Sequence, residues 1–150
     1  MAELELAPLV KTITVRRTPA EAFEIFTAGL ARWWPFDRFS IHQAETATCT
    51  IEPRVGGRVY ETAKNGEEAP WGTVLAWEPP GRFAMTWHPG RPASSAQDVE
   101  VRFEAVPDGT RVTLEHRGWA KLGAEAEETR KSYDNGWAVV FDVRYREACS

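Results

Sequence analysis

The chain of 150 residues has the length of one domain, so a sizeable core can form without a metal or disulfide staple. Its 43% apolar and 27% charged residues are ordinary for a globular protein, but seven tryptophans and seven phenylalanines need either a large core or a cavity. A net charge of −4 with scattered basic residues argues against a nucleic-acid partner. An acidic start and the lack of a long apolar run predict a cytoplasmic protein without membrane contact.

The first predicted element is a strand from Leu9 to Arg16, where apolar and polar residues alternate. Lys11 interrupts its apolar face, which favours an edge position in a sheet. Thr18 to Glu21 then forms a capping box with proline at the first helical position, so a helix begins there. Gly29 predicts a break into a second short helix, which ends at Pro35.

The middle of the chain, 45–117, predicts an antiparallel meander. Its turn signals are Gly56-Gly57, Asn65-Gly66, Pro79-Pro80-Gly81 and Asp108-Gly109. The segments on either side of the last turn alternate strictly between apolar and polar residues, which predicts one face toward the core and one toward water. In the second of them, this alternation places His116 on the apolar face.

From about Ala124 the period becomes helical, with a charged first part followed by an apolar stripe of Tyr133, Trp137, Val140 and Phe141 that continues to Arg144. The predicted order is therefore a strand, two short helices, about six strands and a long helix. One domain over 1–150 follows, in which a curved antiparallel sheet has one long helix to cover it.

No catalytic constellation appears in the sequence. The three histidines, His42, His88 and His116, lack metal-type spacing, and no HExxH motif, nucleophile elbow or phosphate loop occurs. Cys49 and Cys149 are expected to be free thiols. A cofactor is not implied either.

Several short motifs resemble one known family. They are Gly56-Gly57-Arg58, Trp71-Gly72-Thr73-Val74, Glu78-Pro79-Pro80, the strand from Phe83 to Trp87, and Gly136-Trp137. Together they are similar to single-domain proteins related to the activator of heat-shock-protein-90 ATPase, within the START-like (SRPBCC) superfamily. The resemblance runs from Ile13 to Phe141. It implies an α+β helix-grip fold, in which seven antiparallel strands grip the C-terminal helix and two short helices roof a pocket.

The residues expected at a ligand pocket are mostly aromatic and come from every part of the chain. They are Phe26, Trp33, Trp34, Phe36, Tyr60, Trp71, Trp87, His116, Tyr133, Trp137 and Phe141. The alternative for Trp137 and Phe141 is simple core filling, and for His116 a hydrogen-bonded structural histidine. Arg58 and Asp134 are further candidates for inward polar groups, although solvent exposure is the favoured interpretation for both.

Three functions are compatible with these observations. The leading hypothesis is that an apolar cavity binds a small hydrophobic molecule such as a lipid, an aromatic or a polyketide-like compound. The second is a cyclase or hydratase in which His116 or Tyr60 carries a proton. The third, a co-chaperone role, follows from the resemblance alone and ranks low, because this chain lacks the N-terminal domain of the chaperone activators. A homodimer through a sheet edge or Trp33-Trp34 is an open alternative.

Overall fold

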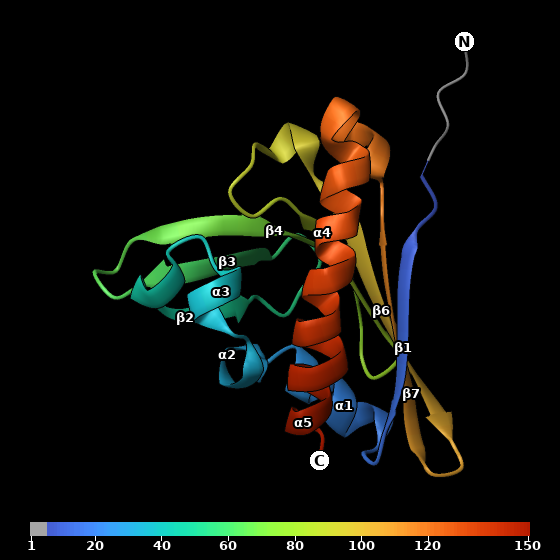
Figure 1. Ribbon diagram of the computed structural model, residues 1–150. Helices are drawn as coiled ribbons and strands as arrows, with labels where there is room; N and C mark the ends of the chain where they lie inside the picture. Colours follow the sequence, from blue (N-terminus) through green and yellow to red (C-terminus); the bar gives the residue numbers. More distant parts are fainter. Residues whose placement is uncertain (1–5) are drawn as a thin grey trace.

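The computed structural model describes residues 6–150, which form a curved antiparallel sheet around a C-terminal helix (Figure 1). Among these residues the sheet has seven strands in the order β1-β7-β6-β5-β4-β3-β2. The strands are β1 (Leu9–Val15), β2 (Thr46–Ile51), β3 (Arg58–Ala63), β4 (Glu68–Glu78), β5 (Arg82–Trp87), β6 (Gln97–Val106) and β7 (Gly109–Arg117). The helix-grip fold expected from the resemblance is thus confirmed.

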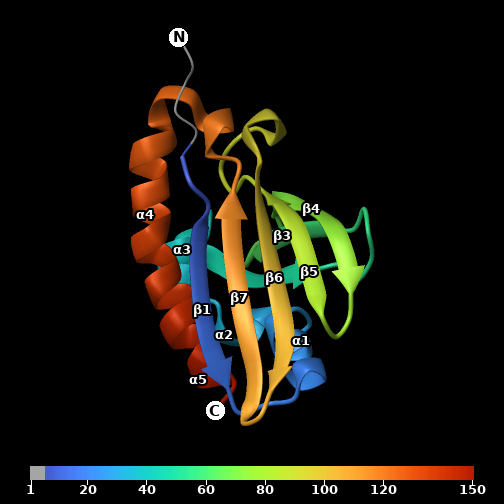
Figure 2. The ribbon, with the colours of Figure 1, turned by 90° about the vertical axis from the view of Figure 1, so that its right-hand side faces the viewer.

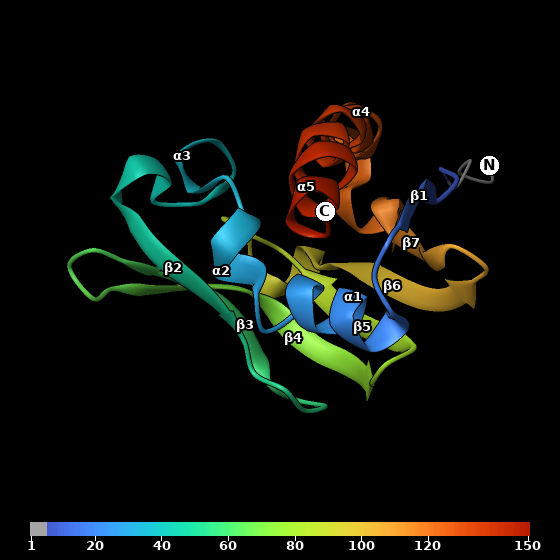
Figure 3. The same cartoon turned by 90° about the horizontal axis from the view of Figure 1, so that it is seen from below.

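Three short helices follow β1 and lie on the side of the sheet that also carries the C-terminal helix (Figure 3). They are α1 (Pro19–Phe26), α2 (Leu30–Trp33) and α3 (Phe36–Phe39). The predicted capping box opens α1: Thr18 Oγ1 accepts from the Glu21 amide at 3.2 Å, and Glu21 Oε1 accepts from the Thr18 amide at 3.0 Å. The third helix was not predicted, because in the order expected from the sequence the second short helix ends at Pro35 and the next element, the meander, begins at residue 45.

The C-terminal helix consists of α4 (Ala126–Val139), a π-helical segment (Val140–Tyr145) and α5 (Arg146–Ala148). It runs along the concave side of the sheet, beside β1 (Figures 1 and 2). The wider turn of the π-helical segment shifts the inward stripe by one residue, so Tyr145 is buried and Arg144 is exposed. The expectation that Arg144 continues the apolar stripe is therefore wrong.

Polar contacts connect edge strand β1 and the residues just before it to the C-terminal helix. Lys11, the residue that interrupts its apolar face, forms an ion pair with Asp134 of α4 at 2.6 Å. Arg130 of the same helix donates to the carbonyl oxygens of Ala7 and Pro8. β1 is therefore an edge strand, as the position of Lys11 in the sequence indicated, and side chains of α4 contact it and the residues just before it.

The two cysteines do not form a disulfide, and both thiols are buried. Burial, aided by the nearby Glu61 carboxylate, raises the pKa of Cys49 to about 12. Burial also raises the pKa of Cys149. Both cysteines therefore pack as small apolar side chains rather than as reactive thiolates.

A glycine at position 72 allows β4 to pass unusually close to β5. A Cβ atom built on Gly72 would lie 1.8 Å from the carbonyl oxygen of Thr86. Neighbouring bonds fix this approach: the Thr73 amide donates to Thr86 Oγ1 at 2.8 Å, and the His88 amide donates to the Trp71 carbonyl at 2.6 Å. No side chain fits at position 72 unless the two strands separate.

Gly72→Ala should therefore destabilise the protein by about 3 kcal/mol or more, because backbone rather than a flexible side chain must move. Gly81→Ala is the matched control, since the nearest atom to a Cβ there lies 3.9 Å away. That substitution should leave stability unchanged or raise it by up to about 1 kcal/mol. Urea unfolding of both variants measures the difference, and equal stabilities would contradict the close-approach argument.

Candidate functional site

A cavity of about 450 Å³ lies between the C-terminal helix, the end of α3 and the loop after β5. Its walls come from three segments far apart in the sequence. They are formed by Trp34, Phe39, Ser40, Ile41, Trp87, Pro89, Gly90, Ser132, Tyr133, Gly136, Trp137 and Val140. The volume falls within the range of small-molecule sites, roughly 300–1,000 Å³.

Four tryptophans from different elements form the aromatic floor of this cavity and the core beneath it. The ring centroids of Trp34 and Trp71 are 5.0 Å apart, those of Trp71 and Trp87 5.5 Å, and those of Trp87 and Trp137 5.6 Å. Trp71 is fully buried, whereas the other three line the cavity. Each of the four indole N–H groups already donates within the protein, so a ligand would meet the rings.

Tyr133 brings a hydroxyl with an unused proton to this site. Its hydroxyl accepts from Trp87 Nε1 at 3.1 Å, and among residues 6–150 no acceptor takes the hydroxyl proton. Burial raises the pKa of Tyr133 above its usual 10.0, although the bond from Trp87 opposes this, so the hydroxyl stays protonated near neutral pH. It can donate one hydrogen bond to a bound molecule.

The segment after α3 forms the opposite wall. Phe39 packs on α4 at Gly136, where an added Cβ would lie 3.4 Å from the ring. Beside it, Ser40 Oγ is buried and has no hydrogen-bond partner within the described part of the chain. Phe39 thus rests on a residue without a side chain, next to a hydroxyl whose hydrogen-bonding capacity is unused.

His116 lies at the expected inward position of β7 but is sealed in the core. Trp137 Nε1 donates to its Nδ1 at 3.0 Å, so Nε2 carries the proton and donates to Gln97 Oε1 at 3.1 Å. The Gln97 amide is itself fixed by a bond to the Ser95 carbonyl, and Trp119 stacks on the imidazole with centroids 4.1 Å apart. Desolvation lowers the pKa of His116 to about 3. It is a neutral histidine with both nitrogens engaged.

The other expected pocket residues divide into four groups. Trp34, Trp87, Tyr133 and Trp137 line the cavity. Phe26, Trp71 and Phe141 are packed in the core, and Trp33 and Phe36 line a neighbouring groove of about 680 Å³. Tyr60 and Arg58 do not face the cavity, because the inward positions of β3 are Val59, Glu61 and Ala63.

Arg58 stacks on the Tyr60 ring at 4.3 Å and pairs with two glutamates, Glu52 and Glu68, at the surface. Asp134, half exposed, pairs with Lys11 as described. Solvent-side roles for Arg58 and Asp134, the favoured interpretation from sequence, agree with these positions. Tyr60 was expected inward and lies on the outer face.

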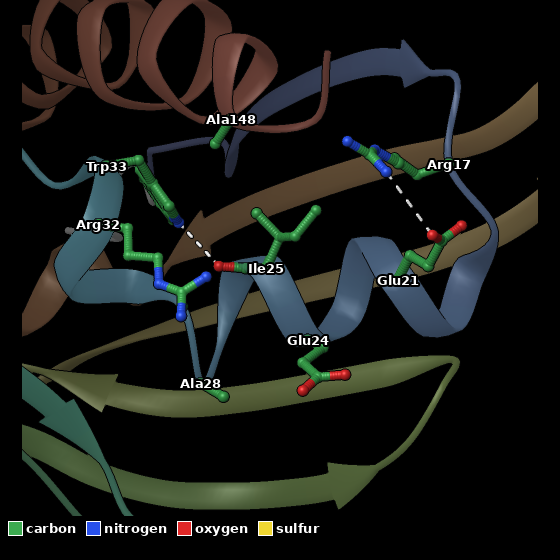
Figure 4. Close-up of a pocket in the computed structure, with 9 residues that line it drawn as sticks. Arg17, Glu21, Glu24, Ile25, Ala28, Arg32, Trp33 and Ala148 are labelled. Carbon is green, nitrogen blue, oxygen red and sulfur yellow. Dashed lines mark hydrogen bonds and ion pairs between the residues drawn. The ribbon is translucent and has the colours of Figure 1, made fainter.

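A second groove, of about 530 Å³, lies between α1, α2 and the C-terminus (Figure 4). Several of its polar groups are already paired. Arg17 contacts Glu21 at 3.6 Å and donates to the carbonyl oxygens of Cys149 and Ser150, while Trp33 Nε1 donates to the Ile25 carbonyl at 2.8 Å. Trp33 is the aromatic residue of its lining, and the charged side chains of Glu24 and Arg32 lie beside it, so it is a weaker site for an apolar ligand than the cavity beside α4.

Sequence reasoning missed Glu61, Ser40, Ile41 and Gly136. For Glu61 a signal existed, because Val59 and Ala63 flank it at the period of a strand and mark its face as the buried one. For Ser40 and Ile41 none existed, since their placement depends on contacts with residues distant in sequence. Residues 6–150 contain no group of three or more His, Cys, Asp or Glu side chains that could hold a metal ion. No helix in the same range is long and apolar enough to cross a membrane.

The buried neutral state of His116 predicts how stability depends on pH. In the unfolded chain His116 takes up a proton near its usual pKa of 6.5, whereas in the folded chain its pKa is only about 3. Stability is therefore complete above 6.5 and falls as pH decreases, with a contribution of up to about 1.4 kcal/mol per pH unit. His116→Gln should show a shallower slope in urea unfolding between these limits. An identical slope in the variant would contradict a neutral buried imidazole.

Comparison with known proteins identifies the family. The family model described as "Activator of Hsp90 ATPase homolog 1-like protein" matches residues 16–143. A comparison with curated protein sequences gives no match. NE0264 from Nitrosomonas europaea shares the fold with 18% identity and a TM-score of 0.69, and the match covers 94% of this chain and 92% of that one. BH1534 from Bacillus halodurans shares it with 20% identity and a TM-score of 0.70, and the match covers 97% of this chain and 99% of that one.

A third solved structure is more similar in sequence. It is the anthrahydroquino-γ-pyrone synthase Txn09 complexed with SUM, which is 32% identical. The match covers 96% of this chain and 97% of that one, with a TM-score of 0.66. By the family match and by this relative, the chain belongs to the activator of Hsp90 ATPase homolog 1-like family, with the helix-grip fold of the START-like proteins.

Proposed function

We propose that the cavity beside α4 binds a flat aromatic small molecule that carries a hydrogen-bond acceptor such as a ketone oxygen. Two features together carry this proposal: the indole walls, whose N–H groups are all engaged, and one partly buried tyrosine hydroxyl, whose proton is free. The rings would supply apolar area, and Tyr133 would fix the orientation of the ligand.

The energetics favour a ligand of this shape. Apolar area removed from water contributes about 25 cal/mol per Å², and offset or edge-on contacts between aromatic rings add about 0.5–1.5 kcal/mol each. Trp34, Phe39, Trp87 and Trp137 come from three different segments, so a planar molecule among them would meet rings on several sides. An aliphatic lipid would gain the area term but not the ring contacts.

The relative Txn09 supports the same chemical class. It is named as an anthrahydroquino-γ-pyrone synthase and is 32% identical over nearly the whole chain. A hydroxyanthraquinone is therefore a reasonable probe, because it is planar, polycyclic and carries ketone oxygens. Quinizarin has these features and is coloured.

Quinizarin should bind one molecule per chain, and Tyr133→Phe should weaken binding about threefold to tenfold, the effect of one lost hydrogen bond. Tyr60→Phe is the matched control, since it removes the same hydroxyl from the outer face and should leave the dissociation constant unchanged. Visible-absorption titration of the dye measures all three proteins. No binding to the parent protein, or equal losses in the two variants, would argue against this site.

A second candidate function is cyclisation of such a molecule, which is favoured by the synthase named among the relatives. In γ-pyrone formation from a β-diketone, a phenol oxygen adds to a side-chain carbonyl carbon, and the phenol proton passes to the carbonyl oxygen. The resulting hydroxyl then leaves as water with a proton from the carbon between the two carbonyls, which forms the ring double bond. Tyr133 could donate a hydrogen bond to the carbonyl that the phenol oxygen attacks. His116 has both ring nitrogens engaged and Tyr60 lies on the outer face, so this proposal does not use them.

If the protein is such a cyclase, a hydroxyanthraquinone with a neighbouring β-diketone should lose one water in its presence faster than in buffer. Tyr133→Phe should then lower the turnover number about 100-fold, the lower range for one acid–base group, whereas Tyr60→Phe should not change it. Mass spectrometry of timed reactions measures the product. A rate equal to that in buffer would leave ligand binding as the function.

A further inference from the structure

Glu61 is a fully buried carboxylate on the inward face of β3, between Val59 and Ala63. A charge in this position is costly unless several donors meet it. Burial alone would raise the pKa of Glu61, but hydrogen bonds from the His42 and Ile41 amides, the Trp71 indole and the His42 ring outweigh it and lower the pKa. The side chain is therefore ionised, and its surroundings are built for the ionised form.

The donors to Glu61 come mainly from the segment that forms one wall of the cavity. The Ile41 amide donates to Oε1 at 2.6 Å, and the His42 amide donates to Oε2 at 2.8 Å. His42 Nδ1 and Thr46 Oγ1 also meet Oε2, at 2.6 and 3.3 Å. One carboxylate thus holds two consecutive backbone amides directly after Phe39 and Ser40, which line the cavity with Ile41.

The remaining donor connects Glu61 to the aromatic floor. Trp71 Nε1 donates to Oε1 at 2.7 Å. The Trp71 ring in turn contacts Trp34 and Trp87, both of which line the cavity. Glu61 therefore bonds to the wall after α3 and supports the floor through one indole.

We infer that Glu61 is a positioning residue of the ligand site, which sets the distance between the Phe39–Ile41 wall and the tryptophan floor and so determines ligand affinity. This inference rests on the proposed ligand function. The chemistry requires a carboxylate, because every neighbour is a donor: a glutamine would direct its own NH₂ group at one set of these donors. Loss of the charge at Glu61 should weaken the attachment of the Phe39–Ile41 wall even in a variant that still folds.

Glu100 provides a matched control, because it is another buried glutamate whose carboxylate is held by several partners. Its carboxylate is only 3% exposed and pairs with Arg82 and Arg102 at 2.6 and 2.9 Å. It lies on the outer face of β6, since Val99 and Val101 beside it point into the core. Glu100→Gln removes a buried charge of the same kind without touching the cavity.

The experiment compares Glu61→Gln, Glu100→Gln and the parent protein by amide hydrogen exchange and by quinizarin titration, at a temperature where all three are folded. In Glu61→Gln, the amides of Ile41 and His42 should exchange about tenfold faster or more, and the dissociation constant should rise about tenfold or more. In Glu100→Gln both quantities should stay within about twofold of the parent values. Glu61→Asp, which keeps the charge but shortens the reach, replaces Glu61→Gln if that variant does not fold.

Each outcome decides a different statement. Unchanged exchange at Ile41 and His42 would overturn the positioning role, whatever happens to binding. Faster exchange with unchanged affinity would show that the wall does not set affinity, which also overturns the inference. If the parent protein does not bind quinizarin, the proposed function fails with this probe, and the exchange rates alone decide whether Glu61 holds the wall.

Discussion

The space between sheet and helix is filled by indole rings, of which Trp119 is buried with no acceptor for its N–H among residues 6–150. Burial of the others at low cost requires an acceptor for each N–H. This requirement connects the elements of the protein. Trp34 donates to the Phe39 carbonyl of α3, Trp71 to Glu61 of β3, and Trp87 and Trp137 to Tyr133 and His116. Since an unpaired buried donor costs about 1–3 kcal/mol, each bond fixes both the ring and the element that supplies the acceptor. The site geometry is a consequence of these pairings.

The same requirement explains why one carboxylate and one imidazole lie beside the indole rings of the core. Glu61 and His116 are completely buried, and each accepts from a tryptophan. Both are deprotonated, but they differ in charge and reach it by different routes: converging donors keep Glu61 ionised, whereas desolvation keeps His116 neutral. Neither needs a catalytic role to account for its position, because each is an acceptor that an indole requires.

Much of the fold could be predicted from sequence because its signals are local. The capping box located the start of α1, the alternation in β6 and β7 identified their buried faces, and Lys11 marked the edge strand. The prediction failed where a regular period is broken or ambiguous. One extra residue in the π-helical segment exchanged Arg144 for Tyr145 in the core, and β3 carries a polar residue on both faces, so Tyr60 was placed inward in place of Glu61.

The candidate site was predictable only in part. Tryptophans are conspicuous in a sequence, and four of the expected aromatic residues do line the cavity. The wall after α3 has no such signal, because its position depends on a carboxylate that comes about 20 residues later in the chain, at a distance that no local pattern encodes. Likewise, Gly136 matters only because Phe39 packs against it from another element.

The contact among the tryptophans also has an optical consequence. Neighbouring indole centroids in the cluster lie between 5.0 and 6.0 Å apart, from Trp34 to its three partners and from Trp87 to Trp71 and Trp137. At such separations excitation passes between rings faster than it is emitted, so the cluster behaves as one chromophore rather than as four. A molecule that quenches the fluorescence of any one of these rings would therefore lower the emission of the others, including Trp71, which does not line the cavity.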